Sequence, residues 1–429
     1  MHELSQMIKD DMKPALGVTE PGAIAFAVAK ARSYTAGQLV RVNVAMNSGM
    51  YKNAFTCGIP NSKEVGNVFS AALGYVAGNA EKGLEALADV KEADNTEAQR
   101  LIDEGKITVE LSGITSRIFI EATVETVTDK AVVSIRDSHT NITKITVNGK
   151  TELETEDENK SEDAETSEEG HSIHQYTLQQ IYDYITTVDI EEISFIKEAY
   201  KVNLELFHEG LKNPKTTFAR HLLELNGGKE VSENEQSTAS LMCNAAIEAR
   251  VIGLDKPAMS ITGSGAHGII ATMPLYAAYK VNGYTEEKLL RATALSYLVC
   301  MFIKEYSGRL SAFCGCAIAA GSGMACALVY LRGGTVEIMA HTLNNMASSI
   351  TGMICDGGNQ GCTMKGIAAV DAAYKSVDFA MSGIYICDVH GINGKTPEET
   401  MRNMGLIASP GMTGTEKTIV EIFEDKLKN

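Results

Sequence analysis

Strand-like and helix-like sequence occupy different parts of this chain, and that division constrains the fold more than any other feature. The convincing runs rich in Val, Ile and Thr lie within the first 150 of the 429 residues. From Leu178 onward Ala, Leu, Met, Glu and Lys dominate, and glycine-rich breaks separate the apolar stretches. The sequence therefore predicts an α+β protein, in which a mixed α/β domain precedes an all-helical domain.

Five segments of the first part are predicted strands. They are LVRVNVAM (39–46), KITVELSG (106–113), RIFIEATVETV (117–127), KAVVSIRDS (130–138) and NITKITVNG (141–149). Asn148-Gly149 is a hairpin turn signal, because both residues tolerate positive φ. We expect helix from Leu4 to about Ala36, interrupted at LGVTEPG, and again over residues 63–105.

An acidic segment separates the two parts. Residues 152–169 hold ten Asp or Glu and one Lys, with almost no apolar side chains to bury. We predict a solvated linker or surface loop over residues 151–172. The predicted domains are then residues 1–150 and residues 173–429.

Charge and apolar patterning exclude several function classes. The formal net charge is −17, which argues against nucleic-acid and anionic-membrane partners, because both need clustered Lys and Arg. The first residues, MHELSQMIKDDMK, lack the apolar core of a secretory signal. Residues 310–331 carry no charge but are rich in Gly, Ser and Cys, so we predict a buried helix or helix pair. We expect a cytoplasmic protein.

Two glycine-containing segments could face a substrate. In ALGVTEPGA (15–23), Thr19 and Glu20 precede a helix start at Pro21, where backbone N–H groups are free. This segment is either a substrate-facing turn or a plain helix cap. In ITGSGAHGIIATMP (261–274), the glycines let backbone N–H groups approach a small anion, and His267 could act as acid or base. Glycine clusters are also ordinary turns.

Cysteines concentrate in the second half. Only Cys57 precedes residue 240, and two motifs, LSAFCGC (310–316) and TGMICDGGNQGCTMK (351–365), hold Cys314, Cys316, Cys355 and Cys362. An iron–sulfur cluster needs thiolates on flexible backbone with N–H groups free to bond to sulfide. The spacing matches neither a zinc ribbon nor a ferredoxin run. From the residues alone, a cluster and buried structural thiols remain equal alternatives.

The motifs in their order resemble those of the UPF0597 family. They are LGVTEP near the start, MYKNAFTCGIPN (50–61), DSHTNI (137–142), TGSGAHGIIATMP, LSAFCGC and GMICDGGNQGC followed by Lys365. That family includes L-cysteine desulfidases and is related to the α-subunit of iron–sulfur L-serine dehydratases. The resemblance covers nearly the whole chain except the acidic segment, and it implies that the helical domain is serine-dehydratase-α-like.

The resemblance implies a 4Fe–4S cluster held by three cysteines, here Cys314, Cys355 and Cys362, with Cys316 competing with Cys314. One iron stays open as a Lewis acid for the leaving sulfur or hydroxyl. A base removes the α-proton, and the elimination product hydrolyses to pyruvate and ammonia. The expected activity is that of a lyase of amino-acid catabolism, acting on L-cysteine, with sulfide released, or on L-serine.

Two departures from the family pattern bear on the base. Relatives carry Cys where this chain has Val18, and they tend to read GSGNQG where this chain has GSGAHG. We therefore expect His267, or else Glu20 with a pKa raised by burial, to take the α-proton, with Thr19 beside them. The alternative is a cluster-binding family member without desulfidase activity, with another substrate or a binding or sensing role.

The remaining expectations concern the partners. A small amino acid should be the substrate, and a homo-oligomer is left open. Lys52 is the expected partner of the substrate carboxylate. The other expected substrate-binding residues are Asn53, His139, Ser264, Gly265 and Gly268.

Overall fold

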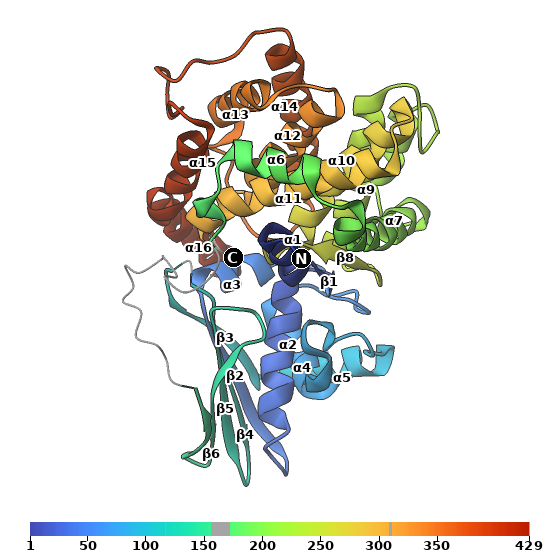
Figure 1. Ribbon diagram of the computed structural model, residues 1–429. Helices are drawn as coiled ribbons and strands as arrows, with labels where there is room; N and C mark the ends of the chain where they lie inside the picture. Colours follow the sequence, from blue (N-terminus) through green and yellow to red (C-terminus); the bar gives the residue numbers. More distant parts are fainter. Residues whose placement is uncertain (116, 156–171, 309–310, 429) are drawn as a thin grey trace.

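The computed structural model describes residues 1–115, 117–155, 172–308 and 311–428. These residues form a sheet lobe and a helical lobe, and both ends of the chain lie near the junction between them (Figure 1). The α+β architecture predicted from the sequence is confirmed. Most of the predicted acidic loop, residues 156–171, lies outside the described residues.

The sheet lobe contains a six-stranded sheet in the order β3-β2-β4-β5-β6-β7. Strands β2 and β3 pair in parallel and the other neighbours are antiparallel. All five predicted strands are present. The strands are β2 (Leu39–Asn47), β3 (Ile107–Gly113), β4 (Phe119–Thr126), β5 (Lys130–Arg136), β6 (Ile142–Val147) and β7 (Lys150–Glu154).

Two helices cover one face of the sheet, α2 (Thr19–Arg32) and α4 (Asn67–Val76), and α5 (Glu92–Asp103) packs on α4. Val42, Val44 and Met46 of β2 point to this face and are fully buried. Alternate residues of β4 are likewise buried. One-sided burial explains the period-two pattern that revealed the strands in the sequence.

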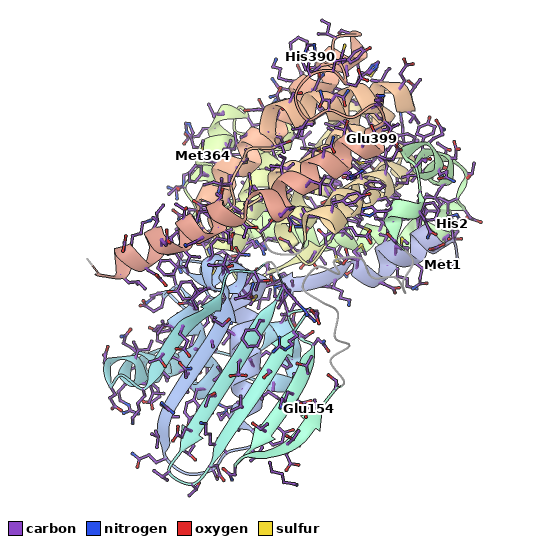
Figure 2. The ribbon with its side chains drawn as sticks, turned by 90° about the vertical axis from the view of Figure 1, so that its left-hand side faces the viewer. Met1, His2, Glu154, Met364, His390 and Glu399 are labelled. Carbon is purple, nitrogen blue, oxygen red and sulfur yellow. The ribbon has the colours of Figure 1, made fainter. Side chains whose placement is uncertain are left out.

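The hairpin between β6 and β7 turns at Asn148 and Gly149, as predicted, with φ of 51° and 82°. Its second strand, β7, occupies residues that the acidic composition had suggested for a loop. In Figure 2, Glu154 at the end of β7 lies in the sheet lobe, whereas Met1 and His2 lie against the helical lobe.

The helical lobe surrounds α12 (Gly321–Leu331). This helix packs against α10 (Gly265–Asn282), α11 (Glu286–Ser307), α13 (Val336–Ile350) and α14 (Gly361–Met381). The uncharged stretch thus forms a buried helix, preceded by a π-helical turn at Cys316–Ala320. Within the described part of the chain, no helix is long and apolar enough to span a bilayer. The lobe also contains α6 (Leu178–Thr187), α7 (Lys197–Lys212), α8 (Phe218–Leu225), α9 (Glu235–Val251) and α15 (Pro397–Leu406).

The two lobes exchange their terminal segments. The expected first helix is split into α1 (Glu3–Asp11), β1 (Lys13–Leu16) and α2, and β1 pairs with β8 (Pro257–Ser260) of the helical lobe. At the other end, α16 (Thr413–Lys428) reaches the sheet lobe, where Phe423 stacks on Phe55 with ring centroids 4.6 Å apart. The short strand β8 is the exception to the predicted all-helical composition.

Candidate functional site

A cavity of about 70 Å³ lies where the two lobes meet. The sheet lobe contributes side chains from α2, from α3 (Ser48–Ala54) and from the loop after β5, and the helical lobe contributes the rest. The cavity is lined by Glu20, Asn53, His139, Thr262, Gly263, Ser264, His267, Lys304, Ser311, Phe313, Gly315, Cys316 and Cys355. Half of the twelve site residues expected from the sequence are among them.

Glu20 is a buried carboxylate that contacts side chains of α2, of α3 and of the loop after β5. Asn53 Nδ2 donates to its Oε1 at 2.9 Å, and Thr19 Oγ1 donates to its Oε2 at 3.1 Å. His139 Nε2 lies 3.7 Å from Oε1. Burial raises the pKa of Glu20, but His139, Asn53 and Arg250 together outweigh it and lower that pKa to about 2. The expected raised pKa is therefore wrong, and Glu20 is ionised.

His267 occupies the first turn of α10 and is 5% exposed. Its Nδ1 shares a hydrogen bond with Thr262 Oγ1. Burial, followed by the positive charges of Lys304 and Arg250, lowers the pKa of His267 to about 3. Its imidazole is therefore neutral near pH 7, whereas the sequence suggested the ordinary pKa of histidine.

Gly315 lets His267 approach the first cysteine motif. A Cβ on Gly315 would stand 2.8 Å from His267 Nε2 and 3.1 Å from Lys304 Cδ. The residue between Cys314 and Cys316 must therefore be small.

Lys304 on α11 is a charged lining residue that the sequence did not reveal. It is 7% exposed, and its Nζ donates to the Gly308 carbonyl at 2.7 Å. Burial lowers the pKa of Lys304, against the opposing influence of the thiols of Cys300, Cys316, Cys355 and Cys314. The available signal was a single Lys within the mostly apolar run LVCMFIKEY (298–306), because Lys is rarely found at buried positions.

Lys52 does not line the cavity, in contrast to its expected role. Its fully buried Nζ donates to the Ser311 carbonyl at 2.9 Å and pairs with Glu416 Oε2 at 2.7 Å. Glu416 lies on α16. Lys52 thus joins α3, α16 and the first cysteine motif, and its charge is already matched.

Three other expected site residues, Gly265, Gly268 and Thr19, do not line the cavity and have structural roles instead. A Cβ on Gly268 would lie 1.8 Å from the Met259 carbonyl, and one on Gly265 would lie 2.8 Å from Arg250 Nε. These glycines let α10 pack against β8 and α9, so neither lines the cavity. Thr19 also stays behind the wall and positions Glu20. Ser264, by contrast, lines the cavity as expected.

The two cysteine motifs lie side by side. Phe313 and Ile354 form an antiparallel bridge, in which Cys314 N donates to Met353 O at 3.0 Å and Cys355 N donates to Ala312 O at 2.6 Å. The Cys355 thiol lines the cavity and lies 3.9 Å from Asn53 Oδ1. Cys316 also lines it, whereas Cys314 and Cys362 do not.

The thiols offer the donor chemistry that an iron–sulfur cluster requires. Cys314, Cys355 and Cys362 lie within electrostatic range of one another, and the cation of Lys365 lowers the pKa of each. Burial nevertheless raises the pKa of Cys362 to about 11, so these thiols would release protons on binding a metal.

The described residues contain no group of three or more His, Cys, Asp or Glu side chains placed around a single metal ion. A cluster binds each thiolate at a different iron, so its ligands stand farther apart. Soft sulfur donors on two adjacent loops, one of them glycine-rich, fit a three-thiolate cluster.

Val18 contacts the second cysteine motif. A Cβ on Gly358 would lie 3.0 Å from Val18 Cγ1, and Gly358 N donates to Asn53 O at 3.1 Å. The residue at position 18 therefore packs on the loop between Cys355 and Cys362.

Comparisons with known proteins show the family of this chain. Residues 81–421 match the model of the family described as "Serine dehydratase alpha chain". A UPF0597 protein of Clostridium botulinum (strain Hall) is 39% identical over 98% of both chains. A UPF0597 protein of Caldanaerobacter subterraneus subsp. tengcongensis is 36% identical over 99% of this chain and 98% of its own. One of Clostridioides difficile (strain 630) is 31% identical over 99% of both. This chain therefore belongs to the UPF0597 family and, through its matched region, to the serine dehydratase alpha chain family.

Proposed function

We propose that this protein is a β-eliminating lyase of small α-amino acids, with L-cysteine as its first substrate and L-serine as its second. The observation that carries the proposal is the pairing of a buried carboxylate, Glu20, with a buried ammonium, Lys304, on the walls of one cavity. An α-amino acid is a zwitterion and presents the complementary pair of charges. Glu20 and Lys304 therefore place opposite charges on the walls of one cavity, where a zwitterion can contact both.

The size of the cavity favours a short side chain. About 70 Å³ of free space leaves room for several water molecules or for one small polar molecule. Cysteine and serine each carry one heavy atom beyond Cβ, and Phe313 and Gly315 close the wall beside Cys316.

In this proposal, some lining residues bind the substrate and another accepts its proton. Glu20 and Asn53 receive the substrate ammonium, and Lys304 pairs with the substrate carboxylate. His267 accepts the α-proton at Nε2, the nitrogen nearest Gly315. A carboxylate beside Lys304 offsets one of the positive charges that lower the pKa of His267, so substrate binding favours the protonated imidazole.

Cys314, Cys355 and Cys362 would hold a 4Fe–4S cluster beside the cavity. When bound, the cluster supplies an open iron as a Lewis acid for the leaving sulfur or hydroxyl group. Cys355 is the ligand nearest to the proposed substrate, because its thiol lines the cavity. The cytoplasm suits this chemistry, since thiols stay reduced there.

A second candidate function is favoured by Val18, which occupies the position of the relatives' cysteine and packs on the loop between the cluster cysteines. In that case the protein binds the cluster but does not release sulfide from L-cysteine, and it acts on another small amino acid.

Purification without oxygen, followed by iron and sulfide analysis and by pyruvate assays with L-cysteine and L-serine, tests the proposal. We expect about four irons and four sulfides per chain and pyruvate from at least one substrate. The His267→Asn variant should lose elimination and keep the visible absorbance of the cluster. Pyruvate that appears from L-cysteine only after the Val18→Cys substitution would favour the second function. Absence of iron from a folded, anaerobic sample would contradict both.

A further inference from the structure

We propose that Thr262 is a positioning residue that fixes the tautomer of His267, so that Nδ1 carries the proton and Nε2 is left as the acceptor at the cavity. This inference rests on the proposed role of His267 as the base. It goes beyond that role, because it assigns a function to a side chain of the turn before α10 and selects one of the two ring nitrogens.

The hydrogen bonds around the Thr262 hydroxyl determine the tautomer. Thr262 Oγ1 donates its only proton to the Ile261 carbonyl at 2.8 Å, and the same Oγ1 contacts His267 Nδ1. With its proton used, the hydroxyl can only accept, so Nδ1 must be the donor. The hydroxyl contact at Nδ1 therefore requires an N–H on this side of the ring.

The backbone of Thr262 supports a functional reason for this side chain. Thr262 and Gly263 have φ of 51° and 75°, and Ile261 and Ser264 exchange two backbone hydrogen bonds across them. Such a two-residue turn favours Asn, Asp or Gly at its first position. A β-branched residue is strained there, and strained residues that persist often cluster at functional sites.

The turn is anchored from the other end of the chain. Thr262 N donates to a carboxylate oxygen of Asp11, the last residue of α1. The β1–β8 pair, which joins Lys13 to Ser260, lies directly beside this contact. The N-terminal segment thus holds the strained turn in place, and Thr262 itself lines the cavity.

Three substitutions at one position separate a positioning role from a structural one. Thr262→Val keeps the β-branched shape and removes the hydroxyl, so kcat should fall about 30- to 100-fold while KM changes less than about twofold. Thr262→Ser keeps the hydroxyl and should retain kcat within about threefold. Thr262→Asn relieves the turn strain, so Tm should rise while kcat falls.

The tautomer is measured directly by nitrogen-15 NMR of histidine-labelled full-length protein without added iron, with His267→Asn identifying the signals. We expect a protonated Nδ1 in the wild type and a mixture of tautomers in Thr262→Val. This spectrum is independent of turnover, so it tests Thr262 even if the protein does not eliminate. Thr342→Val is the matched control, because Thr342 is also buried and bonds to a helix carbonyl, that of Ile338. An unchanged tautomer or an unchanged kcat in Thr262→Val would overturn the proposal.

Discussion

Glu20 and Lys304 keep opposite charges in one buried cavity because each has its own stabilising neighbours. Glu20 accepts hydrogen bonds from Asn53 and Thr19 and lies beside His139. Lys304 donates to a backbone carbonyl and lies near several thiols. The two groups thus present opposite charges on the walls of one cavity, as the proposed binding of a zwitterionic amino acid requires.

The lowered pKa of Glu20 predicts a specific dependence of stability on pH. The folded pKa of about 2 lies below the usual 4.5, so the stabilisation is complete above about pH 4.5 and is lost as the pH falls toward 2. Protonation should cost about 1.4 kcal/mol of unfolding free energy between about pH 7 and about pH 3.5. Urea titrations at both pH values measure this loss.

The Glu20→Gln variant isolates this contribution. Its unfolding free energy should change less between the two pH values than that of the wild type, by about the amount assigned to Glu20. The variant should also raise KM for the amino acid about tenfold or more, since it removes the partner of the substrate ammonium. Glu205→Gln, at an exposed position on α7, should reproduce the wild-type pH dependence. If the unfolding free energy of the wild type and that of Glu20→Gln changed equally between the two pH values, the lowered pKa would not belong to Glu20.

At the residue scale, sequence motifs located the side chains of the site better than they predicted what each side chain does. The TEPG turn and the TGSGAHG loop supplied Glu20, Ser264 and His267, because polar groups beside glycines at helix starts are unusual enough to notice. Lys304 was missed because its α11 position has no such motif. Lys52 was assigned to the substrate because Glu416, its partner 364 residues away, cannot be paired with it from sequence.

Among the elements, α16 acts as a strap across the junction. Its Glu416 forms a buried ion pair with Lys52 of α3, and Lys52 also holds the Ser311 carbonyl before Cys314. Glu416→Ala would leave the Lys52 ammonium buried without its carboxylate. We expect a loss of about 3–5 kcal/mol in unfolding free energy, measured by chemical denaturation.

A double substitution provides the internal check. Lys52→Met with Glu416→Leu should recover most of the loss, because no buried charge remains unmatched. The control is the exposed Lys417–Glu421 pair on the same helix, at 3.8 Å, whose removal should cost less than about 1 kcal/mol. A Glu416→Ala variant as stable as this control would show that α16 is not a strap.

The packing of α10 on β8 gives a second prediction at this scale. A methyl group at Gly268 would collide with the Met259 carbonyl at 1.8 Å. Gly268→Ala should therefore lower the unfolding free energy by about 3 kcal/mol or more. Gly414→Ala in α16 meets no atom within 4 Å and should be neutral or slightly stabilising. Thermal denaturation of both variants tests this difference. A similar Tm change in the two variants would mean that the close contact at Gly268 does not determine its effect.

Local patterns predicted the strands of the sheet, because each strand carries its own alternation and turn residues. They did not predict β8, nor the split of the first helix into α1 and β1. Strands β1 and β8 pair with each other across the chain, with Lys13 opposite Ser260. A strand of four residues is too short to show an alternating pattern in the sequence. Contacts between segments that are distant in the sequence therefore account for most of the elements that local patterns did not predict.

At the scale of the whole molecule, the site exists only where the two lobes are joined. Glu20, Asn53 and His139 come from the sheet lobe, and Lys304, His267, Cys316 and Cys355 come from the helical lobe. Because α1 and β1 pack in the helical lobe and α16 packs on the sheet lobe, neither lobe completes its core alone. The exchange of ends fixes the relative position of the lobes, and with it the cavity.

A cluster bound by Cys314, Cys355 and Cys362 would tie the two cysteine loops together at this junction. Ligands that bind only the folded state stabilise it in proportion to their affinity, so removal of the cluster with a chelator under anaerobic conditions should lower Tm by about 5 °C or more. Anaerobic reconstitution with iron and sulfide should restore it. Cys362→Ser should abolish this difference between the two forms, whereas Cys387→Ser, at an exposed cysteine, should leave it intact. Equal Tm values for the chelated and reconstituted wild-type protein would mean that the thiols serve packing alone.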